Sequence, residues 1–282
     1  MRIGVHCSVR NGFAEAIREA SRLGCEAMQM FSRSPRMWRT RTHDREEFLK
    51  FREAREETGI YPVAVHSPYL PNLCTSRDQL YDLSCRVLKE DLKICGDLGV
   101  EYLVIHPGAY SPEESLEAGL SQLARALRQA LQEVNNSTVV LIENMAGGGR
   151  RVGARFEEIR SVMERLDGNP RLGVCFDTCH ALGAGYEVNS NEGVERVLKE
   201  FKRHLDVGLV RMFHVNDSKA PLGSHRDRHE HLGKGYVGER AFRALLCRPE
   251  FRSVAAILET PKDSPEADPQ NLRVLRGYLK QR

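Results

Sequence analysis

The stretch Leu172-Gly-Val-Cys-Phe-Asp177-Thr-Cys-His180 joins a short apolar run to two polar side chains. The apolar run, which ends abruptly at Asp177, is typical of a strand covered on both faces of a sheet. A carboxylate buried at the end of such a strand is costly unless it is paired or binds a metal. Asp177 therefore needs a partner, and His180 is a metal-ligand residue type in the same neighbourhood.

Strand-like segments of this kind alternate with amphipathic helical segments along the whole chain. We expect strands at residues 2–6, 27–31, 62–66, 101–106, 138–143, 171–176, 208–215 and 253–259. Helices are expected between them at 12–23, 44–58, 77–98, 111–134, 156–166, 194–205 and 241–246, with a weaker one around Leu272. Ser111-Pro112-Glu113-Glu114 has the residues of a helix start. This alternation, without a linker, predicts an α/β fold with a single domain over residues 1–282, the (β/α)8 TIM barrel.

The composition is that of an ordinary globular protein. The chain has 282 residues, 41% of them hydrophobic and 29% charged, and a formal net charge of +3. It has no apolar run long enough to cross a membrane, and it begins with strand-like sequence rather than a signal peptide, so we expect a cytoplasmic protein. The eight cysteines are scattered, which favours reduced, buried thiols in that compartment.

Six of the eight expected strands end in a residue type that binds metals. These residues are His66, His106, Glu143, Asp177, His214 and Glu259. In a TIM barrel the carboxyl ends of all strands converge on one mouth, where active sites lie. The sequence therefore predicts that these side chains meet.

Three further candidates lie in loops on the same face. His180 follows the sixth strand, and Asp227 and His229 point the same way in an extended segment after the seventh. Each residue alone is more often a hydrogen-bonded or ion-paired core residue. Together, nine such groups in an apolar-walled mouth require cations, and four-coordinate zinc with a bridging carboxylate suits the set. A thiolate ligand from Cys175 or Cys179 is a less favoured alternative, and His6 is expected to contact a ligand or the substrate.

Basic residues gather in the loops of this face. They are Arg33, Arg36, Arg39 and Arg41 around Trp38, then Arg150, Arg151 and Arg155, then Lys219, Arg226 and Arg228. A solvated charged surface is the ordinary explanation, but a positive rim around a metal-binding mouth suits a polyanion such as DNA. Tyr69 and Leu70 are either loop packing or residues that wedge into a base stack. The glycines at 147–149 lack the Lys-Ser/Thr of a P-loop, so no nucleotide cofactor is expected.

These motifs together resemble the endonuclease IV family of apurinic/apyrimidinic (AP) endonucleases over essentially the whole chain. The matching pieces are His66-Ser-Pro-Tyr-Leu, His106-Pro-Gly, Glu143-Asn-Met-Ala-Gly, Asp177-Thr-Cys-His180, His214-Val-Asn-Asp-Ser-Lys, Asp227-Arg-His229 and Leu258-Glu259-Thr-Pro. Any one of them is weak evidence, whereas their order and combination are specific.

The resemblance implies a barrel with three zinc ions, with Mn2+ as an alternative at one site. His66 and His106 would hold one ion, Asp177, His214 and Glu259 a second, and His180, Asp227 and His229 the third. Glu143 would bridge the first two and, with Glu259, would be catalytic. Arg36, Tyr69 and Leu70 would enter DNA at the lesion.

The activity implied is hydrolysis of duplex DNA on the 5′ side of an abasic site, which leaves a 3′ hydroxyl. Removal of blocked 3′ ends is also expected, with a monomer acting on DNA and no membrane involved. Metal-activated hydroxide would be the nucleophile, because metal binding lowers the pKa of water from ~15.7 toward ~7.

Two other functions remain open from the sequence. A metal-dependent sugar isomerase or epimerase of the same barrel type needs only a site such as Glu143, Asp177, His214 and Glu259, and would hold one ion. A non-catalytic DNA-binding protein is the third reading, although binding alone does not require a metal-binding mouth. The number of bound ions separates the nuclease from the isomerase.

Overall fold

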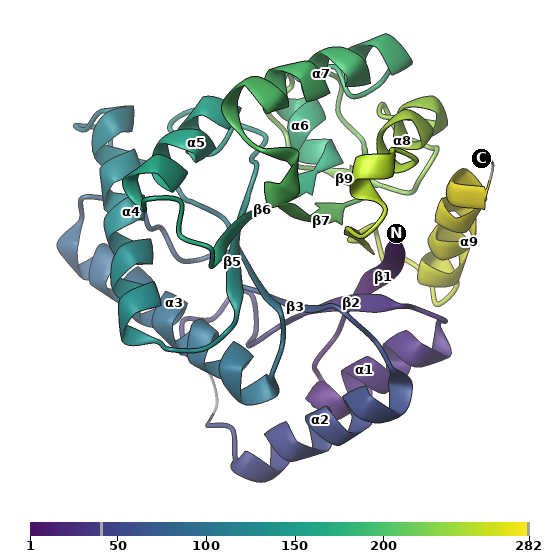
Figure 1. Cartoon of the computed structure of the whole chain (residues 1–282), viewed down its shortest axis with the longest axis horizontal. Helices are drawn as coiled ribbons and strands as arrows, with labels where there is room; N and C mark the ends of the chain where they lie inside the picture. Colours follow the sequence, from purple (N-terminus) through teal and green to yellow (C-terminus); the bar gives the residue numbers. More distant parts are fainter. Residues whose placement is uncertain (40–41, 281–282) are drawn as a thin grey trace.

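Eight parallel strands close into a barrel, around which the helices form an outer ring (Figure 1). The computed structural model describes residues 1–39 and 42–280. The barrel strands are β1 (Arg2–Cys7), β2 (Ala27–Phe31), β3 (Val63–His66), β4 (Tyr102–Ile105), β5 (Val139–Glu143), β6 (Leu172–Asp177), β7 (Val210–His214) and β10 (Ala255–Leu258). They follow one another around the barrel in this order, and β10 pairs with β1. The predicted TIM barrel is confirmed.

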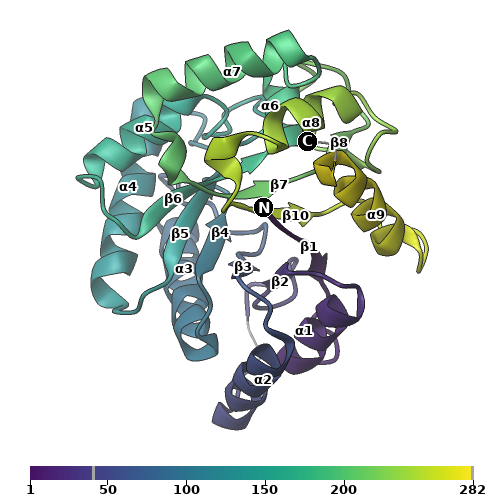
Figure 2. The same cartoon turned by 45° about the vertical axis from the view of Figure 1, so that its right-hand side comes forward.

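Each barrel strand is followed in the sequence by a helix of the outer ring. Figure 2 shows these helices around the barrel from a second direction. They are α1 (Phe13–Arg22), α2 (Arg45–Thr58), α3 (Asp78–Leu98), α4 (Leu116–Glu133), α5 (Phe156–Arg165), α6 (Thr178–Ala184), α7 (Asn191–His204), α8 (Glu239–Leu246) and α9 (Ala267–Lys280). Short 3-10 turns cover Val207–Leu209 and Pro249–Phe251. Within the described ranges, no helix has the length and apolar character to cross a membrane.

Three elements differ from the sequence-based expectation. Helix α6 was not expected, and neither was a small antiparallel pair formed by β8 (Asp217–Ser218) and β9 (His229–Glu230). The predicted start of the fourth helix at Ser111 is wrong. The Ser111 hydroxyl instead accepts a hydrogen bond from the backbone of Ser76 at 3.1 Å, and Ser115 caps α4 by accepting from the Ala118 amide at 3.2 Å.

The barrel interior explains how the strands deliver polar groups to the mouth. One interior cluster contains Ala27, Ala64, Val104, Leu141, Cys175, Met212 and Ile257, one or more from each of seven strands. Side chains alternate across a strand, so the residue two places further along faces the interior again, nearer the mouth. Those residues are Gln29, His66, His106, Glu143, Asp177, His214 and Glu259. A single alternation therefore places an apolar layer beneath a polar one.

Gly4 on β1 packs directly against the neighbouring strand, and we predict that Gly4→Ala destabilises the barrel. A Cβ atom at Gly4 would lie 1.8 Å from the carbonyl oxygen of Ala27, so β1 and β2 would have to separate. Overpacking of this kind lowers the free energy of unfolding by roughly 2 kcal/mol or more. Gly277→Ala on α9, which meets no atom within 4 Å, is the control and should be neutral or slightly stabilising. Equal urea midpoints for the two variants would contradict the packing account.

Candidate metal centre

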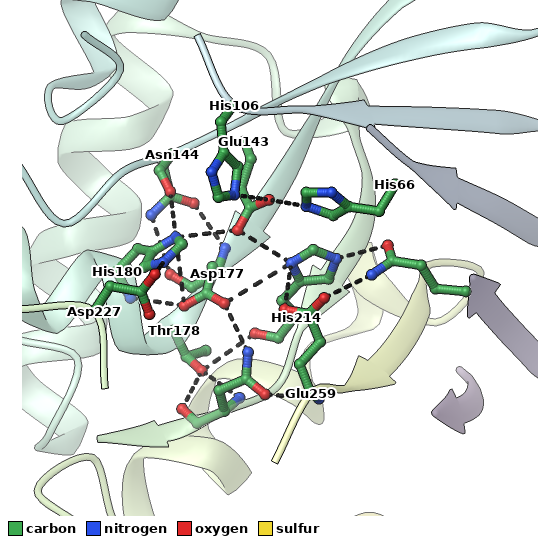
Figure 3. Close-up of polar contacts among 12 residues, drawn as sticks. His66, His106, Glu143, Asn144, Asp177, Thr178, His180, His214, Asp227 and Glu259 are labelled. Carbon is green, nitrogen blue, oxygen red and sulfur yellow. Dashed lines mark hydrogen bonds and ion pairs between the residues drawn. The ribbon is translucent and has the colours of Figure 1, made fainter. Parts of the chain in front are cut away.

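The nine metal-ligand candidates all lie at the carboxyl end of the barrel strands, where they form three overlapping groups. Figure 3 labels all of them except His229. Six come from the barrel strands or the residues directly after them. Asp227 and His229 come from the segment between β7 and α8, and His180 comes from the first turn of α6. The structure thus brings together every residue of the predicted set.

The first group comprises His66, His106 and Glu143. The Nε2 atoms of His66 and His106 each lie 3.2 Å from Oε2 of Glu143. His66 and Glu143 are buried, whereas His106 is partly open to solvent. The two imidazole nitrogens therefore face one carboxylate oxygen at the edge of the mouth, an arrangement that suits a shared cation.

The second group surrounds Nδ1 of His214. This nitrogen lies 3.1 Å from Oε1 of Glu143, 3.3 Å from Oε2 of Glu259 and 3.8 Å from Oδ2 of Asp177. Three carboxylates thus converge on one imidazole in a fully buried position. Because the two oxygens of Glu143 face different groups, this carboxylate is placed to bridge two ions.

The third group joins His180, Asp227 and His229. The Nε2 atoms of both histidines lie 3.2 Å from opposite oxygens of Asp227. Yet both nitrogens are buried and make no well-directed hydrogen bond. A metal site needs ligand atoms that lie close together without hydrogen bonds between them. This group therefore fits a cation better than a hydrogen-bonded triad.

Hydrogen bonds on the far side of the rings orient the histidines toward these groups. Nδ1 of His66 donates to the Ser67 carbonyl at 2.6 Å. Nδ1 of His180 donates to the Asn144 carbonyl at 2.9 Å, and Nδ1 of His229 donates to the Glu259 carbonyl at 3.0 Å. In each ring the other nitrogen, Nε2, then faces a carboxylate oxygen of its group. Metal-binding histidines usually carry such a second hydrogen bond, so the residues present fit zinc.

Asp177 serves two neighbouring elements. Its Oδ1 accepts a hydrogen bond of 2.6 Å from the His180 amide and thereby caps α6, while its Oδ2 accepts from the side chain of Asn216 at 2.7 Å. The second oxygen also faces His214 and His229, each at 3.8 Å. The Asp-x-x-His spacing therefore fixes the separation of the second and third groups.

Gln29 and Asn216 are functional candidates that the sequence analysis did not identify. Gln29 is fully buried, accepts from Nε2 of His214 at 2.9 Å and donates to Oε1 of Glu259 at 2.7 Å. Asn216 donates to Asp177 and accepts from the Glu259 amide at 2.8 Å. The available signal was Gln29 itself, a lone amide inside the apolar strand Ala-Met-Gln-Met-Phe.

We predict that Gln29→Leu weakens metal binding at the second group. The Gln29 carbonyl keeps the proton of His214 on Nε2 and so presents Nδ1 to the carboxylates. Loss of such a partner lowers metal affinity by about 10- to 100-fold. Competition with a colorimetric zinc chelator measures the change, and Gln129→Leu on the exposed face of α4 is the matched control. Identical zinc affinities for both variants would remove Gln29 from this role.

Opposite charges stabilise one another in the buried mouth. Burial opposes the charge on Glu143, but His214 and His106 hold the pKa of its carboxyl well below the usual range. Burial also opposes the charge on His229, but the hydrogen bond to Asp227 and the nearby Asp177 raise its pKa to about 9. Metal ions compete with protons for such ligands, so the same electrostatics favours cations.

His6 and the two cysteines lie beside the groups. His6 Nδ1 is 3.4 Å from Glu259 and accepts from Gln29 Nε2 at 2.9 Å, while burial lowers the pKa of its imidazole. Cys175 lies within ligand distance of Glu143 and His214, but burial raises the pKa of its thiol to about 12. The same cause raises the pKa of the Cys179 thiol to about 12.

The rim of the mouth carries the residues expected to contact DNA. Tyr69 is 55% exposed and packs edge-on against Phe31, and Leu70 beside it is partly exposed. Arg36, Arg39, Arg150, Arg151, Arg155, Lys219, Arg226 and Arg228 are exposed. The expectation for Arg33 was wrong, because its side chain is buried against Asp91. Arg41 lies outside the described residues.

Comparison with known proteins places the chain among barrels of this kind. Residues 17–281 match the family described as xylose isomerase-like TIM barrel. The probable endonuclease 4 of Aquifex aeolicus is 39% identical over 97% of this chain and 96% of its own length. That of Halothermothrix orenii is 36% identical over 94% and 95%. The crystal structure of endonuclease IV from Thermus thermophilus is 40% identical with a TM-score of 0.89, covering both chains fully. A D-tagatose 3-epimerase-like protein shares the fold at 16% identity, with a TM-score of 0.72 and coverage of 99% and 97%.

Proposed function

The chain belongs to the endonuclease 4 family of xylose isomerase-like TIM barrels, and from this premise we propose that it is a DNA-repair endonuclease. It hydrolyses the phosphodiester bond 5′ to an abasic site in duplex DNA and leaves a 3′ hydroxyl. The same reaction at a strand end would remove blocked 3′ groups. The observation that supports the proposal is the set of nine convergent ligand candidates, which is larger than one ion can use.

The residues divide the work between metal binding and orientation. His66 and His106 would hold one zinc ion, Asp177, His214 and Glu259 a second, and His180, Asp227 and His229 a third, with Glu143 shared by the first two. When bound, the ions would lower the pKa of water and neutralise charge on the phosphate. Glu259, with one oxygen held by Gln29 and the other facing His214, would orient the attacking water. The buried carboxylates and imidazoles cost no reorganisation during the reaction.

Recognition of the lesion would use shape rather than base contacts. A strand that lacks a base is easily kinked, and its sugar is easily extruded. Exposed Arg36 and Tyr69, with partly exposed Leu70, lie on the loops after β2 and β3. They would enter the DNA helix while the arginines and lysine of the rim contact phosphates. All nine ligand candidates come from one chain, so a monomer would suffice. We propose that it acts in the cytoplasm. Manganese would substitute for zinc at the oxygen-rich second group.

A sugar isomerase or epimerase remains the second candidate by fold alone. Such an enzyme would use Glu143, Asp177, His214 and Glu259, and it would leave the third group without a role. The orphaned Nε2 atoms of His180 and His229 therefore favour the nuclease.

The experiment that tests the proposal compares two labelled duplexes that differ only by one abasic analogue. We expect chelator-sensitive nicking of the abasic duplex and a product that a DNA polymerase extends, because the new end is a 3′ hydroxyl. The intact duplex should stay uncut. A product that polymerase cannot extend, or equal cutting of both duplexes, would contradict the proposed reaction. Turnover of ketoses in place of nicking would favour the epimerase.

We predict that Tyr69→Ala weakens selectivity for abasic over intact duplex. The ring is more than half exposed at the mouth, and its loss removes the aromatic surface that would fill the space of the missing base. Such a contact is worth about 1–3 kcal/mol, so binding of the abasic duplex should fall by roughly 10-fold or more. Tyr236→Ala, whose exposed ring lies on the loop after β9, is the control. Selectivity that is unchanged in a binding titration would remove Tyr69 from the site.

A further inference from the structure

A buried ion pair lies beside the loops after β2 and β3, and neither of its residues belongs to the metal groups. These two loops, which carry Arg36 and Tyr69, are called the recognition loops below. Arg33, in the loop after β2, and Asp91, on α3, have side chains that are 1% and 0% exposed. Nη2 of Arg33 donates to Oδ1 of Asp91 at 2.6 Å, and Nε donates to the same oxygen at 3.2 Å. Replacing such a pair by apolar residues is often neutral or stabilising, so stability alone does not account for it.

The Asp91 carboxylate collects hydrogen bonds from two separate loops. Oδ1 also accepts from the hydroxyl of Ser32, which precedes Arg33, at 2.6 Å. Oδ2 accepts from the hydroxyl of Ser67, directly after β3, at 2.9 Å. The loop after β2 carries Arg36, and the loop after β3 carries Tyr69. One carboxylate on the outer ring therefore binds the first residue of each loop.

Further bonds extend this link in both directions. The carbonyl of Ser67 accepts from Nδ1 of His66, so the same residue touches Asp91 through its hydroxyl and a metal-ligand candidate through its backbone. Nη1 of Arg33 donates to the carbonyl of Trp38 at 2.9 Å, which ties a second point of the same loop to the ion pair. The Tyr69 amide donates to the Pro35 carbonyl at 3.2 Å, and this bond joins the two loops directly.

We propose that Asp91, paired with Arg33, is a positioning residue that holds the two recognition loops in register with His66. Arg36 and Tyr69 then reach a lesion as one preformed surface, without the entropy cost of ordering two loops on binding. This inference rests on the proposed function, because it attributes part of the selectivity of that site to the Asp91–Arg33 pair. Asp91 itself touches neither DNA nor a metal.

The test is Asp91→Asn, which keeps the size of the side chain and removes its buried charge, while Glu90 still pairs with Nη1 of Arg33 at 3.0 Å. We expect KM for the abasic duplex to rise by about tenfold or more, while kcat changes by less than about threefold and zinc content is unchanged. Glu101→Gln is the matched control. Glu101 pairs with Arg55 at 2.6 Å and accepts from the Val63 amide at the opposite end of β3. It should lose stability without any change in KM.

Loop order has a readout that does not require cleavage. Trp38 is the single tryptophan of the chain, and Arg33 binds its carbonyl. Acrylamide should quench Trp38 fluorescence more strongly in Asp91→Asn than in the wild type or in Glu101→Gln. If the wild-type protein does not nick abasic DNA, the proposed function fails. The quenching measurement still decides whether Asp91 orders the loop after β2.

A second variant keeps the inference testable if Asp91→Asn does not fold. Ser67→Ala leaves the ion pair intact and removes only the bond to the loop after β3. It should raise KM severalfold and reduce the preference for abasic over intact duplex, with zinc content unchanged. Wild-type KM and wild-type selectivity in folded Asp91→Asn, or in Ser67→Ala, would overturn the proposal.

Discussion

Glu259→Gln should abolish cleavage of abasic DNA and leave binding of that DNA largely intact. The substitution keeps the shape of the side chain and replaces a carboxylate oxygen, which faces Nδ1 of His214 at 3.3 Å, by an amide. The negative charge that holds a cation and orients water is then lost, and the expected decrease in rate is about a hundredfold or more. Single-turnover nicking measures the rate, and fluorescence anisotropy of a labelled abasic duplex measures binding.

The control is Glu164→Gln on the exposed face of α5, where the carboxylate pairs with Arg160. It should behave as the wild type in both assays. The role assigned to Glu259 would be lost if DNA binding fell in parallel with cleavage. In that case the residue would shape the site rather than act in the reaction.

Glu143→Ala should remove more metal than any other single substitution in the site. Oε1 of Glu143 faces the imidazoles of His180 and His214 at 3.0 and 3.1 Å, and Oε2 faces those of His66 and His106. A carboxylate shared by two ions stabilises both, so we expect about two of about three ions to be lost, and activity with them. Elemental analysis of the purified variant measures the loss.

Asp227→Ala provides the comparison, because Asp227 faces His180 and His229 of the third group. It should lose about one ion and retain the other two. Equal losses in the two variants would contradict a bridging position for Glu143. Circular dichroism should first show that both variants are folded, since Glu143 is fully buried and Asp227 is exposed.

The barrel and the convergence of the ligand candidates were predictable because both follow from one periodicity. An apolar residue inside the barrel, two places before a polar residue at the mouth, repeats from strand to strand, as in Leu141 and Glu143 or Met212 and His214. Chain order then becomes spatial order, because parallel strands open at the same end. Hence six ligand candidates were identified without any knowledge of tertiary contacts.

The errors concern residues whose roles depend on contacts remote in sequence. Arg33 has the same local context as its exposed neighbours, but its side chain is buried against Asp91, 58 positions away. Ser111 has a good helix-start sequence, but its hydroxyl is engaged by the Thr75–Ser76 segment, so Ser115 takes the cap. Gln29 has no partner nearby in sequence, since His214 and Glu259 lie on other strands. Local patterns do not contain these pairings.

Helix α6 was missed for a different reason. Its seven residues, Thr-Cys-His-Ala-Leu-Gly-Ala, are almost all small and fully buried, so they show no polar face and no amphipathic period. The cap that begins it is Asp177, whose polar character was attributed to the mouth alone. A single carboxylate can serve both, because one oxygen accepts from the His180 amide while the other faces the imidazoles.

The central claim is that the mouth is a multi-metal centre that cuts DNA at abasic sites. One preparation, divided between elemental analysis and a nicking assay on a duplex with a single abasic analogue, tests it most directly. We predict about three divalent ions per chain and a single nick on the 5′ side of the analogue. Activity should vanish when the ions are removed and return when they are restored. A fully metallated protein that does not nick this duplex would contradict the account.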